Sequence, residues 1–431
     1  MGNTTGGALG AAADAAAAAL ATTRMPTTRN ESFRFTDLSP LVGAPIVAHD
    51  KFDADAKQIS VLAQVERLSL EESRGATAVL VNGRFDADLS DLSAVPAGVF
   101  VGPLSSAPDA ARASVGAQSA ARGGPFATLN TATAEDCLVV HVPRGRVVEV
   151  PVHVLCLSAV AEQGVAAVSP RVAVVVEDGG MAELVEEFAP LECGRAGVAG
   201  SYFVNSVAEV ALGEGASLSH RYVETDGADA THVRATLVEQ AEKSLYSLTE
   251  VRLGGRLSRH DLGIAQLGES TRTEMGHFVL VGKDQLHDLH SSLQLDHPEG
   301  QADQLHKCIV AHAEGRGVFD GNVQVNRLAQ RTDAGQLSRN LLLVPKATVN
   351  VKPNLQIVAD DVVCTHGCAV SDLDDDQVFY FLSRGIDEAT ARASLVYSFG
   401  MEVVGRIRQE ALRERLEAAT RESLDACASL S

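Results

Sequence analysis

Short runs of Val and Leu recur along the middle of the chain, from about residue 127 to residue 363, and Gly or acidic residues break each run. Two such segments, VVEDGGMAELVEEF and VALGEGASLSHRYV, share the order strand, turn, strand, and this order returns roughly every 35–40 residues. Because a single coil cannot bury its apolar face alone, repeats of this kind stack and form one continuous Val and Leu core. The repeat therefore predicts a mainly β protein with a parallel β-helix core over residues 127–371.

An antiparallel β-sandwich also contains many short strands and is the main alternative. Two features favour the β-helix. Aromatic residues make up only 4 % of the chain and Trp is absent, so the core consists mostly of small branched side chains in regular layers. In addition, more than 200 consecutive residues contain no clear amphipathic helix.

The residues before the repeat have a mixed pattern, which predicts an α/β region over residues 25–126. Within it, KQISVLAQVERLS has the apolar spacing of a helix, and AVLVNGRFDADLS reads as a strand followed by an Asn-Gly turn. Residues 1–24 are rich in Ala, Thr and Gly and lack the charged segment and apolar core of a secretory signal. We interpret them as a disordered tail, a short helix or the remnant of an organelle transit peptide.

The residues after the repeat, 372–431, are predicted to form a helical domain. The segment LDDDQVFYFLSRG begins with Asp residues, carries Arg384 in its last turn and ends at Gly385, which suits both ends of a helix dipole. The residues that follow carry an apolar stripe, part of which is expected to cover the open end of the β-body while the rest binds a partner. The stripe consists of Leu395, Phe399, Val403, Ile407 and Leu412.

Charge and cysteine content narrow the classes of function. The formal net charge is −20, with 56 acidic against 36 basic residues, which argues against nucleic acid as the main partner. No apolar run reaches the roughly 18–20 residues that cross a bilayer. The 7 cysteines are widely spaced in a long chain, so reduced thiols are expected rather than a disulfide framework.

No catalytic motif is complete. The string closest to a phosphate-binding loop, GHFVLVGKD at 276–284, has the wrong glycine spacing and an Asp where the hydroxyl that binds Mg²⁺ belongs. It reads as a strand that ends in a turn. The chain is therefore not expected to hydrolyse ATP or to be an enzyme itself.

One short string has the residue types of a metal site. In an extended segment, Cys364 and His366 point to the same face, and a thiolate beside an imidazole suits iron, zinc or copper(I). Asp360 and Asp361 lie close enough in the sequence for an outer shell. Two donors do not complete a site, and Cys368 would have to turn past Gly367 to join them. The alternative is a buried cysteine and a hydrogen-bonded histidine.

Three long motifs resemble the SufD branch of the SufB/SufD family of iron–sulfur cluster assembly proteins. They are MPTTRNESFRFTDLSPL near the start, GVFDGNVQVNRLAQRTDAGQLSRNLLLVPKATVNVKPNLQI, and DDVVCTHGCAVSDLDDDQVFYFLSRGIDEATARASLVYSF near the end. The resemblance covers about residues 25–425, and the string HGCAVSDLD is similar to the SufD form rather than the SufB form. The chain departs from the family pattern at Phe33, where Trp is usual, and at Cys368, where Ala is usual.

The resemblance implies a right-handed parallel β-helix and a scaffold role in a complex with a SufB-like subunit and a SufC-like ATPase. It implies that His366 and Cys364 contribute to a transient iron or iron–sulfur cluster site at the interface with SufB, with no cluster bound stably by the chain alone. It also implies that Phe379, Tyr380, Arg384 and Phe399 dock SufC. A homodimer is expected for the isolated chain, with no nucleic-acid or membrane partner. Plastid stroma is the expected compartment, with bacterial cytoplasm as the alternative.

Two other functions stay open at this point. One is a SufB-like scaffold that carries a cluster itself. The other is a β-helix enzyme acting on polysaccharides, which needs a groove of paired acids and aromatic platforms. The absence of Trp and the presence of only 5 Tyr argue against the second.

Overall fold

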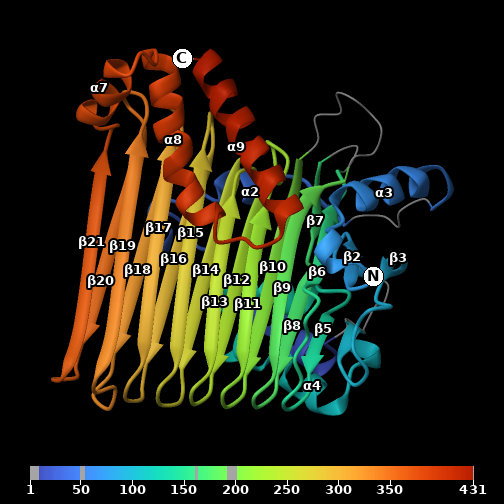
Figure 1. Cartoon of the computed structure of the whole chain (residues 1–431). Coiled ribbons are helices and arrows are strands. Elements are labelled where there is room, and N and C mark those ends of the chain that lie inside the picture. Colours follow the sequence, from blue (N-terminus) through green and yellow to red (C-terminus); the bar gives the residue numbers. More distant parts are fainter. Residues whose placement is uncertain (1–8, 49–53, 161–163, 192–200, 431) are drawn as a thin grey trace.

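Two long, mostly parallel β-sheets face each other in the computed structural model, which describes residues 9–48, 54–160, 164–191 and 201–430 (Figure 1). The chain alternates between the sheets, so that each coil contributes one strand to each. Sheet A contains, in spatial order, β4 (Phe100–Pro103), β5 (Leu138–Val142), β8 (Arg171–Val176), β10 (Ser201–Leu212), β12 (Thr231–Gln240), β14 (Leu257–Gln266), β16 (Leu286–Leu295), β18 (Arg316–Val325) and β20 (Thr348–Ile357). In addition, β7 (Val165–Val168) pairs with β10, and β1 (Ile46–Ala48) pairs with β7.

Sheet B contains the other strand of each coil. Its spatial order is β3 (Arg84–Asp91), β2 (Thr77–Val81), β6 (Val152–Ser158), β9 (Met181–Pro190), β11 (Ser217–Glu224), β13 (Leu245–Arg252), β15 (Arg272–Val281), β17 (Gln301–Val310), β19 (Thr332–Leu342) and β21 (Val362–Ser371). This arrangement confirms the predicted parallel β-helix and excludes the sandwich. Strand β15 ends at Val281 and a turn follows, so the string at 276–284 is a strand and turn as predicted.

The spacing of 35–40 residues is wrong for most of the coils. Met181 pairs with Ser217, 36 residues later, but Ser217 pairs with Leu245, only 28 residues later. Thr236 pairs with Leu262 and Gly321 with Pro353, which are steps of 26 and 32 residues. The segments VVEDGGMAELVEEF and VALGEGASLSHRYV show this spacing because they are one coil apart where the step is long, 36 residues between β9 and β11.

The acidic and Gly-containing turns of the sequence form a ladder along one edge of the β-helix. At the same position in successive turns, a residue with positive φ donates its backbone N–H to a carbonyl of the next turn. The donors are Gly179, Gly215, Lys243, Ser270, Glu299 and Arg331. Stacking therefore satisfies the turn backbone as well as the strands.

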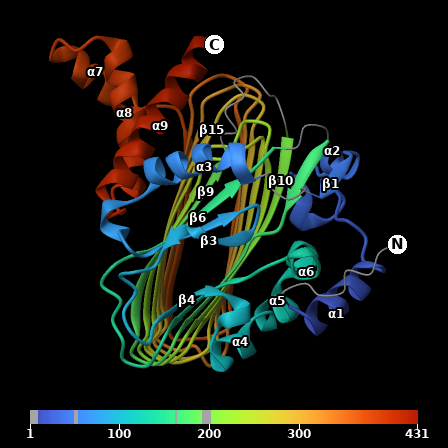
Figure 2. The same ribbon diagram turned by 90° about the vertical axis from the view of Figure 1, so that its right-hand side faces the viewer.

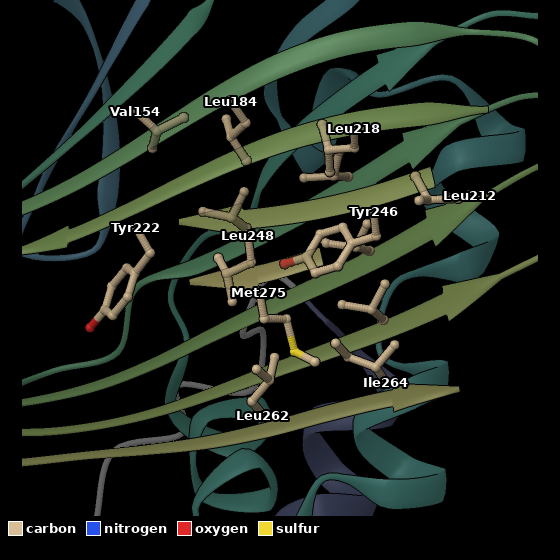
Figure 3. Packing of buried hydrophobic residues seen from close by; sticks show 14 of the residues in the cluster. Val154, Leu184, Leu212, Leu218, Tyr222, Tyr246, Leu248, Leu262, Ile264 and Met275 are labelled. Carbon is tan, nitrogen blue, oxygen red and sulfur yellow. The ribbon is translucent and has the colours of Figure 1, made fainter. Parts of the chain in front are cut away.

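The space between the sheets is filled by alternate side chains from both. In Figure 3, Leu184, Leu218, Leu248 and Met275 of sheet B meet Leu262 and Ile264 of sheet A. Val, Leu and Ala dominate this cluster, as the composition predicts. The side chains on each inner face repeat every second residue, as a pleated strand requires.

The N-terminal end of the β-helix is closed. Strand β3 pairs antiparallel with β2, and β4 pairs antiparallel with β5, so each sheet ends in a reversed strand. Strand β3 carries several charged residues and a register irregularity, and β4 has only 4 residues and includes Pro103. Charge, irregular register, short length and Pro are features that prevent further strand pairing.

Helices cover part of each outer face, as the end-on view shows (Figure 2). On sheet A lie α5 (Ala117–Arg122) and α6 (Gly124–Thr133), with α1 (Ala11–Leu20) packed against α6. Residues 1–8 of the predicted tail lie outside the described residues. Near these helices lies the short helix α2 (Ser39–Val42), and Phe33 and Leu38, which precede it, are buried against the β-helix. Helix α4 (Asp109–Ser114) packs near β5.

On sheet B, α3 (Ala54–Leu68) covers the first coils, and α8 (Glu388–Val404) and α9 (Glu410–Leu430) cover the middle coils. A methyl group on Gly400 would lie 2.6 Å from the ring of Phe278, so glycine is what lets α8 approach β15. Val403, Ile407 and Leu412 are fully buried against this face. The expectation that the stripe covers the open end is thus wrong: it covers the side of sheet B.

Helix α7 (Asp375–Ser383) stands beside the ends of the last strands (Figure 1). The Asp374 side chain accepts a hydrogen bond from the backbone N–H of Asp376 at its start, and Gly385 has φ +80° after its end. The helix starts at the Asp residues and stops before Gly385 as predicted, but Arg384 is the C-cap residue after α7 and not part of its last turn. None of the described helices is long and apolar enough to cross a membrane.

Candidate functional site

The last coil, made of β20 and β21, is the open end of the β-helix. No described strand pairs with the outer edge of either, and most residues of β21 are exposed. The ten residues VVCTHGCAVS of β21 contain no Lys, Arg, Asp or Glu. Large apolar side chains are exposed here, namely Ile357, Val358, Val363 and Val370. An uncharged, unpaired strand with exposed apolar residues is a surface that readily pairs with another chain.

Cys364, His366 and Cys368 form a row on the inner face of β21. Their partners in the adjacent strand are Ala334, Gln336 and Ser338, all of which are buried between the sheets. The strand continues through Gly367 without a turn, so Cys368 lies on the same face as the other two but farther along the strand. Because no further coil covers them, His366 and Cys368 are exposed and Cys364 is half-buried.

The two thiols favour their protonated form. Burial, together with the nearby negative charge of Asp333, raises the pKa of Cys364. Burial alone raises the pKa of Cys368. The side chain of His366 makes no hydrogen bond with any described residue. These three groups are therefore available to an incoming metal, which must displace the thiol protons on binding.

The row does not converge on one ion within this chain. Successive donors on one face are about 6.6 Å apart along a strand, so Cys364 and Cys368 are about twice that distance apart. Within the described residues, these donors and the carboxylates of Asp360 and Asp361 do not form a group of three close enough for one ion. The row can supply one or two ligands, and another molecule must supply the others.

The residues predicted to dock a partner fall into two environments. On α7, Phe379 is 69 % exposed and Tyr380 58 % exposed, and the guanidinium of Arg384 lies 5.3 Å from the Tyr380 ring centre. Phe399, on α8, is instead half-buried against sheet B, with the Lys307 ammonium 4.3 Å from its ring centre. The structure therefore groups three of these residues and separates the fourth.

A network of buried ionisable side chains between the sheets was missed from the sequence. It runs through the middle coils: Glu186 pairs with Arg234 and with His220, and Glu250 binds His260 and His277 through Oε2 at 3.0 and 2.8 Å. The network continues toward the open end, because Gln304 contacts His277 at 3.2 Å. In the sequence, the only sign of this network is the alternation of apolar and polar residues in strings such as LSHRYVE. The same alternation is expected when the polar residues face solvent.

Burial and the charged partners together set the protonation of this network. Burial raises the pKa of Glu186, but Arg234 and His220 outweigh it and lower the pKa to about 2. Burial lowers the pKa of His260 to about 4, in spite of the nearby Glu250. At neutral pH, Glu186 is thus an anion and His260 is neutral.

Comparison with known proteins gives one family over almost the whole chain. Residues 158–399 match the family described as "SUF system FeS cluster assembly, SufBD core domain". Residues 4–154 match "SufBD protein N-terminal region". The first of these matches covers the β-helix from β7 onward, including the row on β21.

Proteins that are similar over most of the chain come from a plant and from bacteria. The chain is 41 % identical to "Protein ABCI7, chloroplastic" of Arabidopsis thaliana, over 93 % of this chain and 83 % of that protein. It is 36 % identical to an iron–sulfur cluster assembly SufBD family protein of Synechocystis, over 93 % and 88 % of the two chains. It is 28 % identical to "Iron-sulfur cluster assembly protein SufD" of Escherichia coli, over 92 % and 88 %.

Proposed function

The chain belongs to the SufB/SufD family of iron–sulfur cluster assembly proteins, in its SufD branch, and we propose that it is the non-catalytic scaffold subunit of a SufB–SufC–SufD complex. In this proposal, iron or a nascent cluster is the cargo. The chain binds no cluster stably by itself and contributes part of a site at the contact with SufB.

The observation that carries the proposal is the incomplete donor row on an unpaired strand. Cys364 and His366 lie on the inner face of the last coil, where a second chain pairing with β20 and β21 would cover them. A soft sulfur beside an imidazole nitrogen suits iron, and two such donors leave coordination positions for the second chain. The alternative is a SufB-like scaffold that carries a cluster alone. The spacing of the donors along β21 does not support it, because they do not converge on one ion.

The SufC ATPase is proposed to dock on α7. Phe379 and Tyr380 expose two aromatic rings on one short helix, and Arg384 adds a positive charge beside them. Exposed aromatic residues next to Arg are typical of the energetically dominant residues of protein interfaces. Phe399 contributes to docking by holding α8 in place rather than by direct contact.

The proposed compartment is the plastid stroma. This rests on the relative from Arabidopsis, whose name describes it as chloroplastic. Bacterial cytoplasm is the alternative, because other relatives are bacterial. A fluorescent protein fused to the C-terminus of the chain and expressed in plant cells tests the assignment.

The central experiment is co-expression of the chain with SufB and SufC, followed by iron and sulfide analysis of the purified complex. His366→Ala should lower the cluster content several-fold while the three subunits still co-purify. His297→Ala, which alters a half-buried histidine away from β21, serves as the matched control. An unchanged cluster content with His366→Ala would contradict the proposed site, and so would a stoichiometric cluster in the chain expressed alone.

A further inference from the structure

A second group of possible metal ligands lies inside the β-helix, away from the open end. Glu224 is the last residue of β11, Asp226 lies in the turn that follows, and His232 is near the start of β12. One donor atom from each lies within 4.8 Å of the other two, and within the part of the chain that the structure describes no other three such residues do so. All three residues are buried, with Asp226 the most exposed at 4 %.

The distances among these atoms suit a small cation. His232 Nδ1 is 2.7 Å from Asp226 Oδ2 and 3.7 Å from Glu224 Oε2. Two ligands that are each about 2.0–2.1 Å from a tetrahedral ion are about 3.3 Å apart, which lies between these two values. Small side-chain rotations are therefore enough to place an ion between the three groups.

The surrounding side chains orient all three groups. Ser206 Oγ lies 2.7 Å from His232 Nε2, the nitrogen that faces away from the carboxylates. The hydroxyl of Tyr202 donates to Asp226 Oδ1 at 2.8 Å. Glu224 Oε2 accepts hydrogen bonds from Tyr222 and Ser258. Hydrogen bonds of this kind commonly fix the ligands of protein metal sites.

Charge is unbalanced at this group. Two buried carboxylates face one imidazole. The charge of Arg252 also acts on Glu224, but its Nε lies 2.6 Å from Glu250 Oε1, with which it forms an ion pair. Glu224 Oε1 has no hydrogen-bond partner among the described residues, although Glu224 is only 1 % exposed. An isolated buried carboxylate oxygen is costly unless a proton or a cation neutralises it.

We propose that Glu224, Asp226 and His232 bind one divalent first-row transition-metal ion, of which Zn²⁺ is the representative. Mixed nitrogen and oxygen ligands favour such an ion over Mg²⁺ or Ca²⁺, which prefer oxygen alone. The ion neutralises both carboxylates and ties the turn after β11 to β12. Ala228 and Asp229, which lie between Asp226 and His232 in the sequence, are exposed.

The test uses the full-length chain in a background that removes the open-end donors: Cys364→Ser, His366→Ala and Cys368→Ser. Zn²⁺ is titrated in competition with a chromophoric chelator, bound zinc is counted by elemental analysis, and thermal unfolding is followed by circular dichroism. We expect one zinc ion per chain and a rise in Tm on the order of 3 °C at zinc concentrations well above Kd. EDTA should reverse this rise.

Glu224→Gln and Asp226→Asn keep the shape of each side chain and should each weaken zinc binding by about 100-fold or more. Glu209→Gln is the matched control, because Glu209 is a buried carboxylate that pairs with Arg171 in the same β-helix. It should leave zinc binding unchanged. Should a variant fail to fold, the effect of EDTA on the Tm of the background chain decides the question.

Two results overturn the proposal. The first is a background chain that binds no zinc and whose Tm does not respond to Zn²⁺ or EDTA. The second is zinc binding that both Glu224→Gln and Asp226→Asn leave unchanged. In either case the three residues form a buried acid–base cluster in which a shared proton supplies the missing positive charge.

Discussion

The middle coils and the last coil place side chains at the same inward positions. Only in the middle coils do these side chains have a neighbouring coil on both sides. One column of sheet B runs through Glu250, His277, His306, Ser338 and Cys368, which pair in register from strand to strand. In the middle, Glu250 and His277 bind each other, and His306 contacts Ser338 at 3.2 Å. At the end, Cys368 has a neighbouring coil on one side only.

This difference shows how the same strand pattern yields a stable interior and a reactive end. A polar group inside the β-helix has a coil on either side of it, and pairs such as Glu250 with His277 rigidify the core. A side chain at the same position in the last coil has a neighbouring described coil on one side only. Four predictions test this contrast, from the largest expected effect to the smallest.

The largest effect should come from acid. The pKa of His260 is about 4 in the folded chain, below its ordinary 6.5, so the unfolded chain takes up a proton first and stability falls as the pH drops from 6.5 to 4. Glu186 has a pKa of about 2 in the folded chain, below its ordinary 4.5. The unfolded chain therefore takes up this proton first as well, and the free energy of unfolding falls further below pH 4.5.

Urea unfolding followed by circular dichroism at several pH values measures this loss, since the chain has no Trp for fluorescence. His366→Ala should give the same pH profile, because His366 lies outside the buried network. A stability that stays constant between pH 7 and pH 4 would show that the interior network does not control acid unfolding.

The second effect should come from breaking a buried pair in the middle coils. Arg234→Met leaves the Glu186 carboxylate without its main partner and should lower the free energy of unfolding by about 3–5 kcal/mol. Adding Glu186→Gln should recover a large part of this loss. A single substitution that changes the unfolding midpoint no more than a surface mutation would contradict the role of the pair.

The third effect separates two phenylalanines. Phe399→Asp places a charge against sheet B and should lower the free energy of unfolding by about 2–4 kcal/mol. Phe379→Asp, on an exposed position, should change it by less than about 0.5 kcal/mol but reduce the amount of SufC that co-purifies. Leu328→Asp, at a side chain that is 71 % exposed elsewhere, is the control for capture. Normal SufC capture by Phe379→Asp would refute α7 as the docking helix.

The smallest effect on stability concerns the thiols. Cys364 and Cys368 should react with iodoacetamide in the native chain, Cys368 first because it is the more exposed, with almost no change in Tm. Cys137 and Cys308 should stay unmodified, since burial raises the pKa of each to about 12. Mass spectrometry of timed samples measures the order. Modification of Cys308 as fast as Cys368 would mean that the interior opens readily.

The sequence predicted the β-helix because its strongest signal, the recurrence of Val and Leu runs, is also what holds the fold together. It predicted the ends of α7 because Asp374 and Gly385 act locally. The apolar stripe of the C-terminal helices showed that one face is buried but carried no information about which surface covers it. That surface, sheet B, lies more than 100 residues earlier in the chain for strands such as β13.

The row on β21 was predicted in part. Alternation placed Cys364 and His366 on one face, but a glycine inside a strand reads as a break, and so Cys368 was separated from them. In the structure Gly367 stays in the strand and pairs with Leu337, whose Cδ1 would lie 2.9 Å from a methyl group at this position. The interior network was invisible for a different reason, since alternation does not say which of two faces is inside.

The two ends of the β-helix differ in a way that limits how large an assembly can grow. Reversed, charged or very short strands terminate one end, and unpaired parallel strands form the other. A subunit whose two ends both carried unpaired strand edges would polymerise into a fibre, as subunits with head-to-tail contacts do. This subunit has such edges at one end only, so pairing through β20 and β21 stops after one partner subunit has joined.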